Sequence, residues 1–310
     1  MIIQDRLPKV SVIIISYRVS ELLKQALRSL YYFNNKESIE VIVIDNASND
    51  GTEEMLSKEF PGVKTIINTK NIGFPAANNQ GFQIASGKYI FMLNPDTEFI
   101  SPLIDQLYDY MEKNPKIDLI APKLLNSDRS HQISTWRFPN LLSVTLSLCH
   151  LNSLNRMHFY ADKNPEIHSF EAESMSGAAL FFKRDCLKTA KGLDESMFWI
   201  EDVEFCFRIR KMGYKTMYLT DFELIHHSGQ SAKKNYNISI SNQIYNKIKY
   251  FKKHSTTASA FYISCISFIH VIVKILAFSI LSPFSKIYPL KRNAYVYTLK
   301  RVFNPPTGIA

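Results

Sequence analysis

Residues 87–98 read GKYIFMLNPDTE, a stretch that indicates the fold class of the chain. Tyr89–Leu93 is an unbroken apolar run that follows a glycine and precedes Asn94 and Pro95. Such a run is typical of a central strand that is buried on both faces. Because proline is poorly tolerated inside a strand, we expect Pro95 to turn the chain just past the carboxyl end of this one. Open α/β sheets bind their ligands at that edge, so Asp96 is predicted to lie where a ligand binds.

The acidic residues Asp96 and Glu98 admit two interpretations at this point. Carboxylate oxygens at the rim of a buried sheet can hold a hard divalent cation. Alternatively, Asp96 or Thr97 only caps the amino end of a helix predicted over residues 101–113, since Asp and Thr are common caps. The stretch alone does not decide between a ligand site and a cap.

Strands and helices are predicted to alternate along the first hundred residues. Apolar, largely β-branched runs predict strands at residues 10–16, 39–44 and 63–67. Helices are expected between these strands, over residues 20–33, from about 52 to 60, and from the loop at 71–81 to about Gly87. This alternation predicts βαβ units, and therefore an α/β fold with a mostly parallel central sheet flanked by helices.

Two common phosphate-binding motifs are missing. The first predicted strand reads VIIISYRVS and is not followed by GxGxxG, and GxxxxGK[ST] does not occur. A nucleotidyltransferase that makes nucleotide sugars is disfavoured because it would need a glycine-rich phosphate loop near the amino terminus. A nucleotide can still bind at the carboxyl ends of the first two strands, where Asp45 could accept hydrogen bonds from a base or a ribose. The alternative for Asp45 is a simple turn-forming role.

The net charge of the chain is +9, from 37 basic and 28 acidic residues. A positive chain favours a polyanionic partner such as nucleic acid, an anionic membrane surface or a phosphorylated substrate. Lysine and arginine are concentrated after residue 245, beside an apolar stretch. This arrangement fits a membrane surface better than a nucleic-acid groove, so we expect no nucleic-acid partner. The four scattered cysteines show no zinc spacing and are expected to be reduced core residues.

Four segments in order resemble the amino-terminal half of family 2 glycosyltransferases: VSVIIISY, IEVIVIDNASNDGT, NTKNIGFPAANNQGF and GKYIFMLNPDTE. The spacing is most similar to the branch that includes bacterial rhamnosyltransferases of cell-wall and O-antigen synthesis, and the resemblance extends from about Lys9 to Ser231. It implies a GT-A fold, a single nucleotide-binding α/β domain. We expect this catalytic domain over residues 1–235, with a nucleotide-sugar half over about 1–100, an acceptor half over about 101–235, and a helical extension over 236–310.

The resemblance also implies which residues bind the nucleotide of the donor. Ser16 and Tyr17 would line the base pocket, and Asp45 would contact the base or the ribose. The ribose and diphosphate would lie against a loop that contains Asn71, Gly73 and Asn78.

The implied metal site includes Asp96 and a histidine. Asn94-Pro95-Asp96 takes the place of the family's DxD motif, with Asn94 in place of the first aspartate, a departure that puts the metal affinity in question. Asp96 would bind Mg²⁺ or Mn²⁺ together with diphosphate oxygens and water. The segment 226–231 resembles a late H-x-x-G-x-S segment, whose spacing indicates His226 as a metal ligand and His227 as the second choice. A histidine in the core or on the surface is the alternative.

The resemblance also implies which residues bind the acceptor, and these residues lie in two later segments. Ser176-Gly177, before an apolar run, would approach the acceptor sugar, although plain turn geometry explains a glycine equally well. Trp199 belongs to the aromatic segment before the acidic pair Glu201-Asp202 and would contact the acceptor. The two acids should lie in the first turn of a helix, where they would otherwise only complement its dipole.

The chemistry of glycosyl transfer assigns a role to each acid. The acceptor hydroxyl must lose its proton as it attacks the anomeric carbon, and a carboxylate can take that proton. We assign Asp202 as the general base and Glu201 as a supporting group, and direct displacement then inverts the anomeric centre. The departing diphosphate is neutralised by the metal. The first guess for the donor is dTDP-rhamnose, and a UDP-sugar (galactofuranose, glucose, galactose or N-acetylhexosamine) is the alternative.

The tail combines basic residues with the apolar run Phe261–Leu281, which is long enough to cross a bilayer. Ser264, Ser267, His270 and Lys274 fall on one narrow face, which argues against a simple span. Three interpretations are open: an amphipathic helix in the membrane interface, a helix buried against the catalytic domain or in a dimer, and a transmembrane span. The amino terminus does not read as a secretory signal. We therefore expect a cytoplasmic enzyme, peripheral on the inner face of the cell membrane, with a glycan or lipid-linked saccharide as acceptor.

Overall fold

The computed structural model describes residues 8–149, 151, 168–197, 199–227 and 236–303. The chain divides into two compact units. The first contains Met1–Trp136, Tyr160–Glu195 and Glu201–Ser228, and the second contains Arg137–Phe159, Ser196–Ile200 and Gly229–Ala310. The predicted domains, residues 1–235 and 236–310, stay a prediction.

A mixed sheet forms the centre of the first unit. Among the described residues its order is β3-β2-β1-β4-β10-β6-β11-β5, with β7 paired to β6. The strands are β1 (Val10–Ser16), β2 (Ile39–Asp45), β3 (Lys64–Ile67), β4 (Tyr89–Leu93), β5 (Thr97–Glu98), β6 (Leu119–Leu125), β7 (His131–Gln132), β10 (Ala179–Lys183) and β11 (Thr216–His226). The half formed by β3, β2, β1 and β4 is parallel as predicted, and β10 then runs antiparallel to both β4 and β6.

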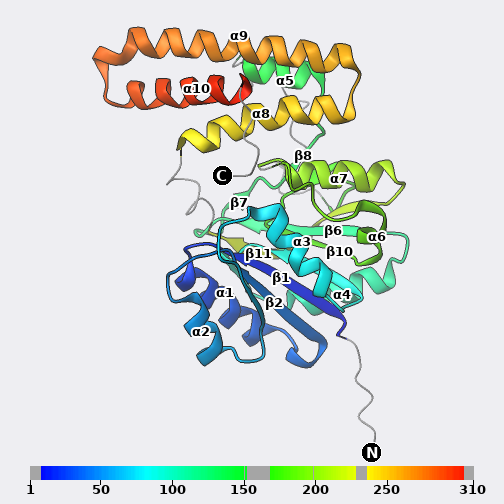
Figure 1. Cartoon of the computed structure of the whole chain (residues 1–310). Helices are drawn as coiled ribbons and strands as arrows, with labels where there is room; N and C mark the ends of the chain where they lie inside the picture. The colour runs from blue at the N-terminus through cyan, green and yellow to red at the C-terminus, as the bar shows by residue number, and fades with distance from the viewer. Residues whose placement is uncertain (1–7, 150, 152–167, 198, 228–235, 304–310) are drawn as a thin grey trace, which may run out of the picture. The chain divides into compact units, whose positions relative to one another are not determined.

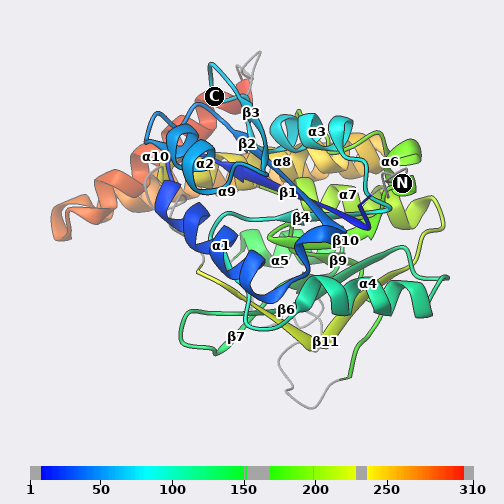
Figure 2. The same ribbon diagram turned by 90° about the horizontal axis from the view of Figure 1, so that it is seen from below.

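Helices cover both faces of this sheet (Figure 2). On one face, α1 (Ser20–Phe33) and α4 (Leu103–Lys113) pack leucines such as Leu27 and Leu107 against alternate residues of the strands. On the other face, α3 (Phe74–Ile84) approaches so closely that a Cβ on Gly81 would collide with Ile13. The five residues of β4 are all buried, as their apolar sequence predicts.

The remaining elements of the first unit lie near the ends of the strands. They are α2 (Thr52–Glu59), α6 (Asp185–Ala190), α7 (Glu201–Lys211), a short helix (Lys36–Ser38), and a small sheet of β8 (Thr135–Trp136) with β9 (Ser174–Met175). Strand β11 contains an irregularity between Leu219 and Glu223, where a turn at Asp221 would also be expected from the sequence. The strand continues past it because its later residues pair with both β6 and β5.

Glu40, at the start of β2, connects three strands at their amino ends. Its Oε1 accepts hydrogen bonds from Ser11 Oγ, Ser86 N (2.6 Å) and Gly87 N (3.1 Å), and its Oε2 pairs with Lys64 Nζ at 2.6 Å. Burial alone would raise the pKa of this carboxyl, but the donors outweigh burial and lower the pKa to about 2. The ionised carboxylate therefore stabilises the folded state.

Helices dominate the second unit. They are α5 (Leu141–Leu148), α8 (Tyr236–His254), α9 (Thr257–Leu281), a 3₁₀ turn (Ser282–Phe284) and α10 (Ile287–Phe303). Figure 1 shows α9 and α10 side by side, with α8 and α5 next to them. Pro289 does not interrupt α10, since it lies in the first turn, where a backbone N–H has no helical partner.

The cysteines are free, as predicted, but only Cys186 and Cys206 are buried. Cys149 and Cys265 are exposed, so the expectation that all four belong to the core was wrong. Both exposed cysteines lie in the second unit, next to or within its helices.

Candidate functional site

Strand pairing brings Asp96 next to His226, 130 residues later in the chain. Thr97 and Glu98 form β5, which pairs antiparallel with the last two residues of β11. The backbone N–H of His227 also donates to the carbonyl of Asp96 (2.8 Å). As a result, His226 Nε2 lies 3.2 Å from Asp96 Oδ1, and both side chains are largely buried. Helix α4 begins only at Leu103, after Pro102, so Asp96 and Thr97 are not its caps.

The hydrogen bonds of His226 make Nε2 an acceptor, and its lone pair faces the Asn94 amide, which a metal would displace. Its Nδ1 donates to Gln132 Oε1 (2.7 Å), and its Nε2 lies 3.2 Å from the Asn94 amide nitrogen, which can donate to it. In that tautomer Nε2 and the Asp96 carboxylate are both acceptors, and two acceptors at this distance are stabilised by a cation between them. Imidazole nitrogen and carboxylate oxygen are ligands suited to Mn²⁺, and the carboxylate suits Mg²⁺. The pair therefore fits a divalent metal.

His227, the second predicted choice, faces other partners. Its Nε2 lies 3.0 Å from Glu98 Oε2 and its Nδ1 lies 2.8 Å from Ser127 Oγ. Within the described residues, no group of three or more His, Cys, Asp or Glu side chains could hold a metal. Any metal here would therefore take its remaining ligands from diphosphate oxygens and water, as Mg²⁺ commonly does. Residues 228–231 of the predicted segment lie outside the described residues.

Asp202 occupies the first turn of α7, as predicted, and the backbone fixes its carboxylate. Oδ2 accepts a hydrogen bond from Gly177 N (2.8 Å), and Oδ1 accepts one from Val203 N (2.8 Å). Part of the residue's surface stays accessible, yet the carboxyl group is deep enough that burial raises its pKa, against the lowering effect of these amides. A carboxylate with a raised pKa is a stronger proton acceptor, which suits a general base.

The Ser176-Gly177 turn brings the chain close to Asp202. This turn separates β9 from β10, and β10 is formed by the apolar run that follows it. A Cβ on Gly177 would lie 3.2 Å from both Asp202 Cβ and Met92 Cε, which explains the glycine by close packing. Immediately after the turn, the carbonyl of Ala178 accepts a hydrogen bond from Asn94 N (2.9 Å). Asp202 and the Asp96 segment therefore adjoin the same edge, where β4 and β10 pair.

Trp199 and Glu201 flank the start of α7. Trp199 has a φ of +91°, which a bulky residue rarely adopts, and its side chain is 38% exposed. Such backbone strain is common at ligand-binding segments. Glu201 is the first residue of the helix and is partly buried.

Three of the predicted donor-site residues carry a buried polar atom that has no hydrogen-bond partner among the described residues. These atoms are Ser16 Oγ at the end of β1, Asp45 Oδ1 at the end of β2, and Asn78 Oδ1 in α3. The other oxygen of Asp45 only accepts a long hydrogen bond from Ser48 N (3.3 Å). Leaving buried polar atoms unsatisfied costs free energy, and a bound ligand would remove that cost.

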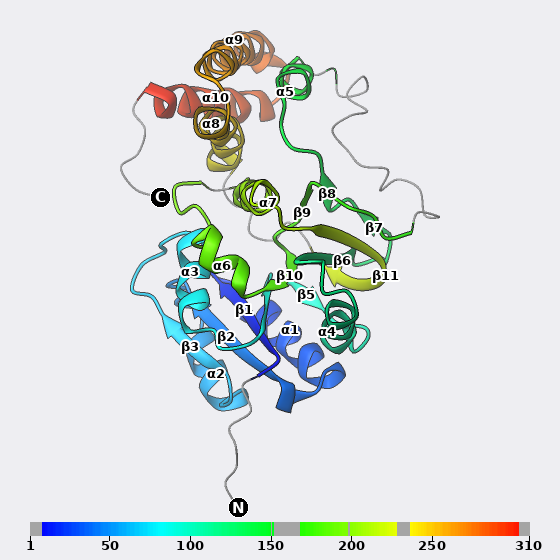
Figure 3. The ribbon, with the colours of Figure 1, turned by 90° about the vertical axis from the view of Figure 1, so that its right-hand side faces the viewer.

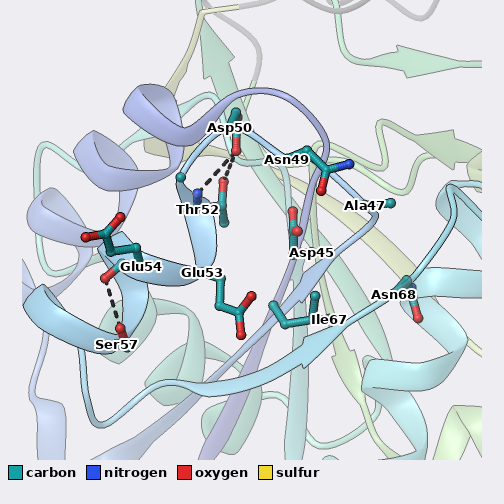
Figure 4. Close-up of a pocket in the computed structure, with 11 residues that line it drawn as sticks. Asp45, Ala47, Asn49, Asp50, Thr52, Glu53, Glu54, Ser57, Ile67 and Asn68 are labelled. Carbon is teal, nitrogen blue, oxygen red and sulfur yellow. Dashed lines mark hydrogen bonds between the residues drawn. The ribbon is translucent and has the colours of Figure 1, made fainter.

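A pocket of about 470 Å³ opens beside Asp45 (Figure 4). It lies at the carboxyl ends of β2 and β3, and Asp45, Asn68 and the residues around the start of α2 line it. The Asp50 carboxylate lines it too, and accepts hydrogen bonds from the amide and hydroxyl of Thr52. A nucleoside-sized ligand can enter such a volume and reach Asp45.

The sequence analysis missed Asn46, which organises the loop at Asn71. Asn46 Nδ2 donates to Asn71 Oδ1 (2.8 Å), and Asn46 Oδ1 accepts from Ile72 N (3.0 Å). Asn71 Oδ1 in turn accepts from Gly73 N, and Gly73 has a φ of +88°, a conformation that favours glycine. Tyr17 directly follows Ser16 at the end of β1, and its ring lies against Arg18. The position of Asn46 directly after Asp45 was the signal in the sequence that could have identified it.

Asn79 connects α3 to the loop before α7, and the sequence analysis missed it as well. Its Nδ2 donates to Leu193 O (3.0 Å) and to Glu195 Oε1 (2.9 Å), and its Oδ1 accepts from Leu193 N (2.8 Å). Gly192 lies so close to this amide that a Cβ would collide with it. Arg208 is structural, because its guanidinium pairs with the buried Glu204 and donates to the carbonyls of Ala190, at the end of α6, and Gly192.

Comparison with known proteins agrees with this geometry. The family model for glycosyl transferase family 2 matches residues 11–169, half of the chain. An N-acetylglucosaminyl-diphospho-decaprenol L-rhamnosyltransferase of Mycobacterium tuberculosis is 24% identical over 250 residues, which cover 74% of this chain and 78% of that protein. A GalNAc(5)-diNAcBac-PP-undecaprenol beta-1,3-glucosyltransferase of Campylobacter jejuni is 31% identical over a third of each chain.

Solved structures support the same fold. A mannosyltransferase from Pyrobaculum calidifontis, in complex with GDP-Man and Mn²⁺, superposes with a TM-score of 0.57 at 16% identity, covering 97% of this chain and 89% of that one. GalNAc-T7 with UDP, GalNAc and Mn²⁺ gives a TM-score of 0.54 at 18% identity, covering 71% and 44% of the two chains. These structures share the fold, and the family model over half of the chain shows that the chain belongs to glycosyl transferase family 2.

Proposed function

We propose that this glycosyltransferase transfers a sugar from a nucleoside-diphosphate sugar to a hydroxyl group with inversion at the anomeric carbon, and that Asp202 is the general base. The single observation that carries the proposal is the Asp202 carboxylate, fixed by Gly177 N (2.8 Å) with a raised pKa. With one base and no covalent intermediate, direct attack on the anomeric carbon inverts its configuration.

Asp202 would act on the acceptor. Its carboxylate accepts the proton of the attacking hydroxyl while the new glycosidic bond forms and the nucleoside diphosphate departs. Because burial raises the pKa of Asp202, the rate should fall as the pH is lowered through that raised pKa and the base becomes protonated. Glu201 and Trp199, beside it in the chain, are the proposed acceptor contacts together with the Ser176-Gly177 turn.

Asp96 and His226 would hold a divalent metal, and Asn94 and Gln132 orient the histidine. When bound, the metal supplies charge neutralisation to the departing diphosphate. The unsatisfied atoms of Ser16, Asp45 and Asn78 would receive hydrogen bonds from the nucleoside. Tyr17, Asn71 and Gly73 complete the proposed donor site.

The acceptor is proposed to be a lipid-linked saccharide at the cytoplasmic face of the membrane, in cell-surface polysaccharide synthesis. Two relatives support this proposal, since their names specify acceptors linked to decaprenol and undecaprenol. The similarity to the M. tuberculosis protein, named an L-rhamnosyltransferase, favours dTDP-rhamnose as donor, with a UDP-sugar as the alternative.

A nucleotide and metal panel tests the donor site directly. Thermal unfolding is recorded with dTDP, UDP or GDP, each with Mg²⁺, Mn²⁺ or EDTA. A ligand at a hundred times its Kd should add about 2.7 kcal/mol to the free energy of unfolding. We expect one nucleotide to stabilise the protein only when a metal is present. If no nucleotide stabilises it under any condition, the assignment of Asp96 and His226 is wrong.

A further inference from the structure

Helix α9 in the second unit exposes an apolar face, while polar Ser267 shares its buried side with Ile263 and Val271. Its polar residues face the neighbouring helices: Ser267 is buried, and His270 Nδ1 donates to the carbonyl of Leu148, at the end of α5 (2.6 Å). Its large apolar residues are exposed instead, among them Phe261 (71%), Leu276 (59%) and Ile280 (73%). A helix of a soluble protein normally buries its apolar side, so this exposed face indicates contact with something other than water.

The apolar surface extends beyond α9. Leu142 on α5, Phe284 in the 3₁₀ turn and Leu290 on α10 are each more than half exposed. Figure 3 shows α5 and α10 next to α9 in a view along the helices. We define the apolar platform as the exposed apolar side chains of α5, α9, the 3₁₀ turn and α10. Single exposed apolar residues are common on protein surfaces and need no explanation. The apolar platform is different, because its members come from three separate helices.

The charge of the tail identifies what the platform contacts. All 28 acidic residues lie at or before Glu223, whereas 12 of the 37 basic residues follow it. The segment after Glu223 therefore carries a formal charge of +12, and the preceding part of the chain carries −3. A second copy would bring the same positive charge to the interface and be repelled, while an anionic lipid surface is complementary to it.

The neighbours of α9 argue that it lies in the plane of the membrane. Its hydropathy and length would allow a span, and only 17% of its apolar window is buried, which a core helix of a soluble fold would not show. Helices α8 and α10 contact it along its length and carry basic residues at several levels, including Lys252 and Lys253 on α8 and Lys291 and Arg292 on α10. If α9 crossed the bilayer, these helices would carry charges into the hydrocarbon, which is costly.

We infer that the apolar platform inserts into the headgroup boundary of an anionic bilayer, with the surrounding lysines and arginines on the lipid phosphates and α9 parallel to the surface. The inference rests on the proposed function only for its purpose, which is to bring the catalytic unit to a lipid-linked acceptor. It specifies the surface, its orientation and the lipid charge that it needs.

Co-sedimentation of the full-length protein with vesicles tests this inference without any sugar substrate. The vesicles contain phosphatidylcholine alone or with about 30% phosphatidylglycerol. We expect binding to the anionic vesicles, and weaker binding at about 1 M salt. The variant Ile269→Glu/Leu276→Glu should bind about tenfold more weakly or worse, because it places two charges in the platform. The control Tyr32→Glu/Met212→Glu makes the same charge change at exposed sites of the first unit and should bind normally.

Three outcomes would overturn the inference. The first is undiminished vesicle binding by Ile269→Glu/Leu276→Glu. The second is a dimer in lipid-free solution that the same variant converts to a monomer, combined with no vesicle binding, which would identify the platform as a subunit interface. The third is a fluorophore on Cys265, in a Cys149→Ser background, that is quenched by probes at the bilayer centre rather than near the headgroups, which would indicate a span. None of these measurements depends on Asp202 or Asp96, so they fail or succeed independently of the proposed reaction.

Discussion

Two carboxylates at the ends of the central strands are held by different means. Asp202 accepts hydrogen bonds from two backbone amides, those of Gly177 and Val203. Asp96 instead lies 3.2 Å from an imidazole that Asn94 and Gln132 orient. Backbone amides are fixed once the chain folds, whereas a cluster of side chains can rearrange around a ligand. The proposed base is therefore positioned by the fold itself, whereas the proposed metal site at Asp96 would be completed only by a bound cation.

The largest effect is expected from Asp202→Asn. The amide keeps an oxygen to accept the Gly177 hydrogen bond, so the fold should persist, but it cannot take a proton. We expect kcat to fall by roughly 10² to 10⁴-fold, the usual contribution of general base catalysis. Nucleotide affinity, measured by calorimetry, should stay within a few-fold. Near-normal turnover in this variant would remove Asp202 from its role.

Asp96→Asn should produce the second-largest effect, and it should differ in kind. Residues that only hydrogen-bond a metal ligand typically cost about 10 to 100-fold in metal affinity when they are removed. Loss of the Asp96 carboxylate, a proposed ligand itself, should weaken the metal-dependent binding of the nucleotide by more than that. Calorimetric titration of the nucleotide with and without Mn²⁺ measures this loss. His226→Ala should behave alike, whereas His227→Ala, next in the chain, is the matched control and should keep metal-dependent binding. If His227→Ala loses more metal-dependent nucleotide affinity than His226→Ala, then His227 is the metal ligand and His226 is not.

A smaller effect is expected from Gln132→Leu. The leucine cannot accept the hydrogen bond from Nδ1–H of His226, so the tautomer with an unprotonated Nε2 is no longer stabilised. We expect the apparent affinity for Mn²⁺ to fall about tenfold, the lower end of the range for such partners. Excess metal should restore turnover in this variant but not in Asp202→Asn. If added metal does not rescue it, Gln132 serves only the fold.

The smallest effect on activity, with a clear effect on stability, is expected from Glu40→Gln at the opposite ends of the strands. The pKa of Glu40 is lowered from 4.5 to about 2, so its stabilisation is complete above pH 4.5 and is lost as the pH falls towards 2. At neutral pH this corresponds to roughly 3 kcal/mol. Urea unfolding should show the loss in the variant together with a flatter dependence on acid pH. Glu54→Gln, in an exposed ion pair with Lys58, is the control and should change little.

The parallel half of the fold could be predicted from local sequence. Buried parallel strands read as continuous apolar runs, so β1, β2 and β4 were placed within a residue of their observed bounds. The antiparallel direction of β10 and the irregularity inside β11 could not be predicted, because both depend on partner strands that are far away in the sequence. Of the two predicted histidines, only the pairing of β5 with β11 shows which one faces Asp96.

The supporting residues were harder to predict than the acids. Asp45, Asp96 and Asp202 each follow or begin a regular element, which marks them in the sequence. Gln132 and Asn79 act through single amide side chains, and nothing in their surroundings distinguishes them from other polar surface residues. The exposure of the apolar residues of α9 could not be predicted either. A helical pattern shows that two faces of a helix differ, but it does not show which face is exposed.

Asn79 has a consequence for how often the loop before α7 opens. One amide side chain makes three hydrogen bonds to Leu193 and Glu195, and moving this loop away from α3 breaks all three. At roughly 1 kcal/mol for each bond, the open form would be populated below about one per cent. The Leu193 amide should then exchange its hydrogen slowly, and in Asn79→Ala it should exchange about a hundred times faster. The rate of that rare opening would set an upper limit on the rate of any step that requires the loop to move.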